Sequence, residues 1–212
     1  MITMVNRTDG RRLRSQQTRR RMLDAAIKLF VQNGYALTTI ESIAQEAGVA
    51  VQTIYFSFGN KQKILKELID LHVAGDDDPV PTLERPHVVA ALSADDPHEL
   101  IRGLARMTRE ISERVAPLLE VLRNAVITND DGTELWAANK EQRRVVQQHF
   151  VDALVKNDAL VEGLTAERAV DICYALLGPE MYNLLVTERG WTPEQWESWA
   201  YDGLCCHLID GA

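Results

Sequence analysis

Cysteine is scarce in this chain of 212 residues, and long hydrophobic runs are missing. Three cysteines, two of them adjacent at Cys205 and Cys206, cannot build a disulfide framework, which favours a reducing compartment. No apolar stretch approaches the roughly 20 residues that a membrane-spanning helix needs. The N-terminus is polar and arginine-rich, without the apolar segment of a secretory signal. We therefore expect a cytoplasmic protein with no membrane partner.

The sequence also lacks the patterns of a β-protein, a metalloprotein or a typical enzyme. No segment alternates polar and apolar residues at the period of a strand, and no repeat is evident. The histidines His72, His98 and His149 are far apart, so we expect no metal and no other cofactor. A helical enzyme is the alternative from another functional class. It would need a nucleophile beside a base or a phosphate-binding glycine loop, and neither pattern occurs.

Charge is distributed unevenly along the chain, whose formal net charge is −8. Residues 1–66 carry 11 Lys and Arg against 4 Asp and Glu, a net charge of +7, whereas residues 67–212 carry 12 against 27, a net charge of −15. This asymmetry indicates a basic segment that faces nucleic acid, joined to an acidic body. A solvated basic tail is the alternative, but it would not account for the basic residues beyond Arg14.

Helical periodicity begins at about Ser15. Residues 1–14 have no period, and we predict a disordered basic arm there. A first helix should run from Ser15 to Asn33-Gly34, and a second should begin after Thr39 as its N-cap, with Ser42 as the N3 partner. Gly48 should end this second helix.

Two further helices complete the basic segment. A third short helix is expected from about Val51 to Phe56, and a fourth from Lys61 after Gly59-Asn60. Short helices around a tight glycine-containing turn match the helix-turn-helix plan. Residues 15–66 are therefore predicted to be a DNA-binding domain.

The remaining residues, 67–212, also have helical periodicity. The Gly75–Pro81 segment should be irregular, followed by a short helix near Val88 to Leu92. Longer helices are then expected at about 98–114, 116–127, 133–157, 165–189 and 193–209. Gly178-Pro179 should kink or break the fourth of these. The predicted fold class is all-α, with a helix-turn-helix head and a C-terminal helical domain.

The basic segment resembles the DNA-binding domain of the tetracycline-repressor (TetR) family over residues 18 to about 66. The matching residues are Ala25-Ala26-Ile27-Lys28-Leu29-Phe30, Gly34-Tyr35, Thr38-Thr39-Ile40, Ile43-Ala44, Ala47-Gly48-Val49, Thr53-Ile54-Tyr55, Phe58 and Lys61. The resemblance implies a homodimeric transcription factor, most often a repressor, that binds a near-palindromic site in double-stranded DNA. It also implies that residues 67–212 bind a small-molecule effector and dimerise, and that effector binding moves the two heads apart.

The resemblance places the third helix in the major groove. Its DNA-facing positions would be Ala50, Val51, Gln52 and Thr53. Gln52 can hydrogen-bond adenine bidentately, and the others can meet thymine methyl groups. A core position for Val51 is an equal alternative. Phe56 can lie on either side of the helix.

The resemblance also implies phosphate contacts by Tyr55, Lys61 and Thr39. A plain N-cap is the alternative role of Thr39. Arginines of the arm at Arg11, Arg12 and Arg14 either reach the minor groove or are solvated.

Residues of the acidic body are assigned to two roles by the resemblance. The expected dimer interface contains Leu176, Leu184, Trp196, Trp199, Leu204 and Leu208. For the effector pocket the resemblance implies only its presence in this body, and the kink at Gly178-Pro179 suggests as its lining Met107, Trp136, Phe150, Tyr174, Met181 and Tyr182. Intrachain core is the alternative for both sets.

The signal that controls DNA binding is also open to an alternative. A partner protein or thiol chemistry could replace a small ligand. Cys205-Cys206-His207 suggests a thiol switch, but adjacent cysteines on a helix point about 100° apart, and packing at an interface is the favoured role.

Overall fold

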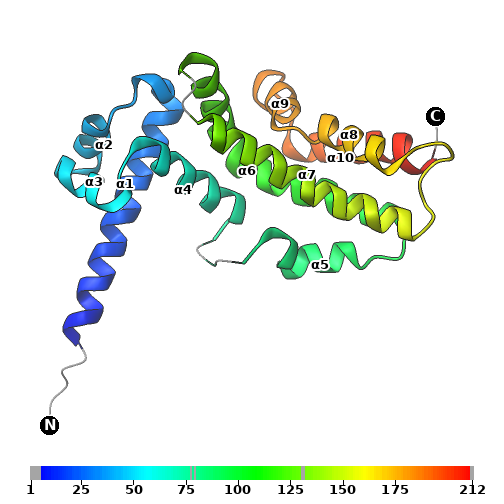
Figure 1. The fold of residues 1–212 in the computed structure, drawn as a ribbon, viewed down its shortest axis with the longest axis horizontal. Helices are drawn as coiled ribbons and strands as arrows, with labels where there is room; N and C mark the ends of the chain where they lie inside the picture. Colours follow the sequence, from blue (N-terminus) through cyan, green and yellow to red (C-terminus); the bar gives the residue numbers. More distant parts are fainter. Residues whose placement is uncertain (1–5, 77, 79, 130–131, 211–212) are drawn as a thin grey trace, which may run out of the picture. The chain divides into compact units, whose positions relative to one another are not determined.

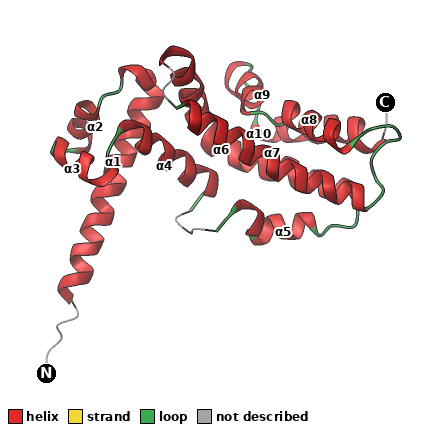
Figure 2. Cartoon of the chain, viewed as in Figure 1, coloured by secondary structure: helices red, strands yellow, loops and turns green. Residues whose placement is uncertain are grey.

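The computed structural model describes residues 6–76, 78, 80–129 and 132–210, and every regular element in these ranges is a helix (Figure 2). The predicted all-α fold class is confirmed. Two compact units are present. The first unit comprises Met1–Ile69 and Val121–Gly132, and the second unit comprises Asp70–Glu120 and Thr133–Ala212. Among the helices of the described ranges, none is both long and apolar enough to cross a membrane.

Four helices make up most of the first unit (Figure 1). They are α1 (Asn6–Leu37), α2 (Ile40–Ala47), α3 (Val51–Phe58) and the first part of α4 (Lys61–Ala74). Helix α2 packs against both α1 and α3. The core between them contains Phe30, Ile43, Ile54 and Ile64, all of them almost completely buried. A small domain of this kind must bury nearly every apolar side chain that its helices offer.

Helix α1 begins earlier than the sequence indicated. It starts at Asn6, so the prediction of disorder up to residue 14 is wrong for residues 6–14, and residues 1–5 lie outside the described ranges. The four arginines of this stretch are good helix formers, and they extend the helix without needing an apolar period. Gly34 interrupts the helical backbone at a φ of 77°, where the sequence predicted the helix to end.

The second unit is also built from helices. They are α5 (Pro86–Leu92), α6 (Pro97–Asn129, in this unit up to Glu120), α7 (Thr133–Lys156), α8 (Ala166–Leu176), α9 (Pro179–Tyr182) and α10 (Pro193–Cys205). A short 3-10 turn at Thr82–Glu84 precedes α5, and π-helical turns follow α9 at Asn183–Glu188 and α10 at Cys206–Asp210. Helix α8 packs against both α7 and α10 (Figure 1).

Two prolines have different effects on the helices of the second unit. The predicted interruption at Gly178-Pro179 is confirmed, because α8 ends before it and Pro179 starts α9. The predicted interruption at residue 115, between the helices expected at 98–114 and 116–127, is wrong, since α6 continues through it and through Pro117. Ala116 and Leu118 on either side are completely buried, so packing holds the helix together in spite of the lost backbone donor.

Candidate nucleic-acid interface and effector site

Helix α3 divides its side chains cleanly between the core and the solvent. Ile54 and Phe58 face inward, with 1% and 6% of their surface exposed. On the outer side Gln52 is exposed, Tyr55 is 45% exposed and Phe56 is 94% exposed. Residues 52, 55 and 56 are spaced i, i+3 and i+4, so they form one strip along the helix. This strip offers an amide between two aromatic rings.

The sequence analysis left the side of Phe56 open, and the structure places it on the surface. The signal was present in the sequence. Ile54 and Phe58 are four residues apart and define the buried face, and position 56 is two residues, or roughly 200°, from each of them. A fully exposed phenylalanine is unusual in a monomer and indicates a contact surface.

The other predicted base-contacting residues surround this strip. Ala50 is exposed, and Val51 and Thr53 are half-buried, so neither the core role nor the surface role of Val51 is excluded. Ala50 is the N-cap of α3 and makes no side-chain capping bond. The helix therefore depends on the packing of Ile54 and Phe58 for its position.

Arg19 of α1 fixes the end of α3. Its Nε donates to Glu67 Oε1 at 2.8 Å, its Nη2 pairs with Glu67 Oε2, and its Nη1 donates to the Ser57 carbonyl at 3.0 Å. The guanidinium also lies 4.2 Å from the centre of the Phe58 ring. The sequence analysis counted Arg19 only as positive charge. Its geometry gives it a positioning role that connects α1, α3 and α4.

The start of α2 has the predicted capping box. Ser42 N donates to Thr39 Oγ1 at 3.1 Å, and Thr39 N donates to Ser42 Oγ at 3.1 Å. Gly48 ends the helix in the left-handed conformation at a φ of 64°. The N-cap role of Thr39 is confirmed, and a phosphate contact by the same residue stays a prediction.

Lys61 has a structural role that the sequence analysis did not foresee. Its Nζ donates to the carbonyls of Tyr35 at 2.8 Å and Thr38 at 3.0 Å, and it lies 4.0 Å from the centre of the Tyr35 ring. These contacts hold the link between α1 and α2 against the start of α4. A phosphate contact by Lys61 therefore stays a prediction, beside a defined role in the fold.

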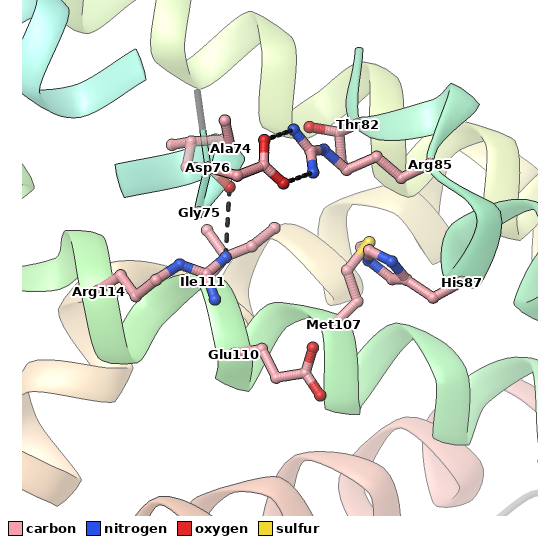
Figure 3. A pocket seen from close by; sticks show the side chains of 11 residues that line it. Ala74, Gly75, Asp76, Thr82, Arg85, His87, Met107, Glu110, Ile111 and Arg114 are labelled. Atoms are coloured by element: carbon pink, nitrogen blue, oxygen red, sulfur yellow. Dashed lines mark hydrogen bonds and ion pairs between the residues drawn. The ribbon is translucent and has the colours of Figure 1, made fainter. Parts of the chain in front are cut away.

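The second unit contains a cavity of about 260 Å³ (Figure 3). Its lining includes Asp76, Arg85, Met107, Glu110 and Arg114. Arg85 holds Asp76 in a bidentate ion pair, with N–O distances of 2.7 and 2.9 Å, and the hydrogen bond from Arg85 lowers the pKa of Asp76 to about 2. Arg114 donates to the Val73 carbonyl at 3.4 Å. Most of the charges on this lining are thus already paired or hydrogen-bonded.

Met107 is among the residues that line this cavity, but the other five predicted pocket residues lie elsewhere in the second unit. Phe150 and Tyr182 belong to its hydrophobic core, where the Tyr182 ring meets Trp196 edge-on at 5.2 Å and burial raises the pKa of Tyr182 to about 12. Met181 is half-buried. Trp136 and Tyr174 flank the guanidinium of Arg143, at 5.7 and 5.1 Å from the ring centres.

The predicted dimer-interface residues fall into two groups. Trp196, Leu204 and Leu208 are completely buried within the single chain, so their assignment to a subunit interface is wrong. They belong to the core of the second unit, the alternative that their apolar spacing left open. Leu184 is 42% exposed, and Leu176 and Trp199 are half-buried, so these three remain on the surface.

The cysteines differ in their surroundings. Cys173 is buried, which raises its pKa to about 12, and Cys205 is buried with its Sγ 3.6 Å from His98 Nδ1. Cys206 is exposed. Cys205 therefore packs in the core of the second unit and not at the predicted interface, whereas an interface role for the exposed Cys206 stays a prediction.

Comparisons with known proteins agree with this geometry. The family model described as bacterial regulatory proteins, tetR family, matches residues 22–68, which include α2 and α3. The HTH-type transcriptional regulator TtgR of Pseudomonas putida is 27% identical over 209 residues, covering 89% of this chain and 92% of the relative.

Solved structures are similar in fold over most of the chain. NalD, described as the secondary repressor of the MexAB-OprM multidrug efflux pump in Pseudomonas aeruginosa, superposes with a TM-score of 0.68 at 20% identity, covering 93% of this chain and all of NalD. The SmeT–triclosan complex superposes with a TM-score of 0.67 at 22% identity, covering 92% and 93% of the two chains.

Proposed function

The chain belongs to the TetR family of transcriptional regulators, and we propose that it is a repressor that a small molecule releases from its operator. The observation that carries the proposal is the outer strip of α3. Gln52, Tyr55 and Phe56 are presented to solvent while Arg19 and the buried face fix the helix. A rigid helix with a polar group between exposed rings is suited to the major groove.

Each residue of the strip has a distinct part in this proposal. Gln52 donates to and accepts from the edge of an adenine, and Phe56 covers a thymine methyl group. Tyr55 contacts a phosphate and thereby sets the register of the helix on the duplex. Ala50, Val51 and Thr53 approach neighbouring bases at the start of the helix.

The same proposal includes a cytoplasmic homodimer. One short recognition helix reads too few base pairs to bind tightly, and two related by a twofold axis would read half-sites about 34–36 Å apart or a multiple of this distance. The exposed Leu184, with the half-buried Leu176 and Trp199, supports an apolar contact with a second copy.

The control of DNA binding is proposed to lie in the second unit, which contains most of residues 67–212. SmeT is similar to this chain in fold and has been solved with triclosan, which supports a small-molecule effector here. The effector must bind the DNA-incompetent conformation more tightly than the competent one, or it shifts nothing. Helix α4 contributes residues to both units and is the proposed route of coupling.

The test is a selection of genomic DNA fragments with the purified full-length protein, at two salt concentrations. Wild type is expected to enrich a near-palindrome, and each phosphate contact should steepen the log–log salt dependence by about 0.9. Tyr55→Ala should lose the enrichment while remaining folded, since the residue lies on the outer side of α3 and is 45% exposed. A folded wild-type protein that enriches no sequence would refute the proposed operator binding.

A further inference from the structure

Arg143 on α7 is half-buried in the second unit, with part of its guanidinium shielded from solvent. Its Nε and Nη1 are both buried without a hydrogen-bond partner, and its Nη2 is 3.5 Å from the Tyr174 hydroxyl oxygen, at the limit of a hydrogen bond. Arginine is always charged in proteins. Three N–H groups of a buried cation are thus left without an acceptor.

Compensating charge is missing at this position. Within the ranges that the structure describes, no Asp or Glu oxygen lies within ion-pair distance of the guanidinium, although the charge of Glu180 reaches it from farther away. Burial lowers the pKa of Arg143, which shows that its surroundings penalise the charged form. An uncompensated buried charge is among the most destabilising features that a fold can carry.

Two buried amides lie on the same side of α7. Asn139 is one turn before Arg143 and Gln147 one turn after it, so the three side chains share a helix face. Asn139 Oδ1 and Gln147 Oε1 are also buried without a partner. Buried polar side chains in folded proteins are nearly always satisfied, so three unsatisfied ones on one face point to a missing ligand.

Aromatic rings border this polar face. The Arg143 guanidinium lies 5.7 Å from the centre of the Trp136 ring and 5.1 Å from that of Tyr174. Trp136, Arg143 and Tyr174 are each only half-buried, so the cluster is open to solvent on one side. An aromatic ligand can contact such rings while its polar group is directed at the guanidinium.

We propose that Trp136, Asn139, Arg143, Gln147 and Tyr174 bind an aromatic carboxylate, and that this class of anion is the effector. The second clause rests on the proposed function. The planar guanidinium pairs its fork of donors with the two carboxylate oxygens. The phenol of Tyr174 donates to the carboxylate, and the unpartnered amide oxygens of Asn139 and Gln147 accept from donor groups on the ring, such as hydroxyl substituents.

Charge favours a monovalent ligand over a phosphate ester. Residues 67–212 have a net charge of −15, which repels anions at long range. A dianion would double this long-range repulsion, and the single guanidinium would neutralise only one of its two charges.

The first test measures binding of 2-naphthoate and of its neutral isostere 2-naphthamide by titration calorimetry, using full-length protein. Wild type should bind the carboxylate at least about tenfold more tightly than the amide. Arg143→Met should weaken naphthoate binding by roughly 10- to 100-fold and remove the preference over the amide. The control is Arg144→Gln, which removes the exposed neighbour that pairs with Glu141 and should bind as wild type does.

A thermal melt of the ligand-free proteins separates a binding arginine from a structural one. Removing an uncompensated buried charge should leave Arg143→Met at least as stable as wild type. If Arg143→Met is clearly less stable than wild type or does not fold, Arg143 supports the fold. If the variant no longer dimerises, a second copy of the chain supplies the hydrogen-bond acceptor for the Arg143 guanidinium. Either result overturns the proposal, as does wild-type protein that binds no naphthoate at millimolar concentration.

The link to regulation is tested by operator release. Naphthoate should release wild-type protein from its selected operator, and Arg143→Met should need a correspondingly higher concentration. Binding at Arg143 without release would refute the proposed function and leave the carboxylate site standing. If the same concentration of naphthamide releases both wild type and Arg143→Met from the operator, the carboxylate site is refuted. The proposed function then stands, because a small molecule still controls DNA binding.

Discussion

Replacing Phe56 by alanine separates DNA recognition from folding more sharply than any other change in α3. The side chain is 94% exposed, so it adds almost nothing to the core of the first unit. Surface substitutions of this kind usually change the free energy of unfolding by less than about 0.5 kcal/mol. We expect Phe56→Ala to melt with wild type.

The expected loss of DNA affinity follows from the area that Phe56 offers. A phenylalanine that becomes fully covered buries at least about 150 Å², which at about 25 cal/mol per Å² corresponds to roughly 4 kcal/mol as an upper limit. A ring that lies against one thymine methyl group covers about half of this area, or about 2 kcal/mol for each half-site. One half-site then loses about 30-fold in affinity, and a dimer on both half-sites loses up to about 1,000-fold.

The assay is fluorescence anisotropy on the selected operator at fixed salt. The matched control is Val31→Ala on α1, which truncates an apolar side chain that is 51% exposed and lies outside the recognition helix. An affinity of Phe56→Ala within threefold of wild type would show that the outer strip of α3 does not meet the bases. Equal losses in both variants would show that exposed apolar surface contributes nonspecifically.

Four further predictions concern stability and thiol chemistry. Thr39→Ala removes the capping box of α2 and should lower the free energy of unfolding by about 1 kcal/mol in a denaturant titration. Lys61→Met removes two bonds to carbonyls and should cost about 2 kcal/mol, with a lowered Tm even in the absence of DNA. Native protein should react with a maleimide at Cys206 and not at Cys173 or Cys205, as peptide mapping would show. Burial raises the pKa of Cys173 to about 12 from 9.0. The stability that its protonated thiol contributes is therefore present below pH 9 and is lost as the pH rises towards 12. Cys173→Ala should reduce this loss of stability at high pH.

The local structure of the first unit was predictable because short-range rules decide it. Thr39 and Ser42 are three residues apart, and that spacing is sufficient for a capping box. Gly48 and Gly34 stand where a helix must end in a positive φ. The core stripe of α3 could have placed Phe56 as well, had its angle to Ile54 and Phe58 been worked out.

The second unit was less predictable because tertiary packing decides it. Pro117 is a helix breaker by its own chemistry, and only the buried neighbours Ala116 and Leu118 keep α6 continuous. Trp196 and Leu204 are spaced as an apolar stripe, but the period does not tell whether the stripe meets α8 of the same chain or a second chain. That distinction depends on contacts between distant segments, which no local pattern encodes.

The same limit applies to charge. Arg19 and Arg143 are equal in a count of basic residues, yet the first has a carboxylate, a backbone carbonyl and an aromatic ring as partners, and the second has two rings and a distant phenol. A satisfied arginine such as Arg19 stabilises the elements that it joins, so its loss should lower stability first and binding only as a consequence. An unsatisfied arginine such as Arg143 lowers the stability of the free protein. A bound anion would pair its charge and restore that stability, which is the reason we propose a ligand there. The hydrogen-bond and ion-pair partners of an arginine, rather than its charge, therefore distinguish the structural Arg19 from Arg143, the proposed effector-binding residue.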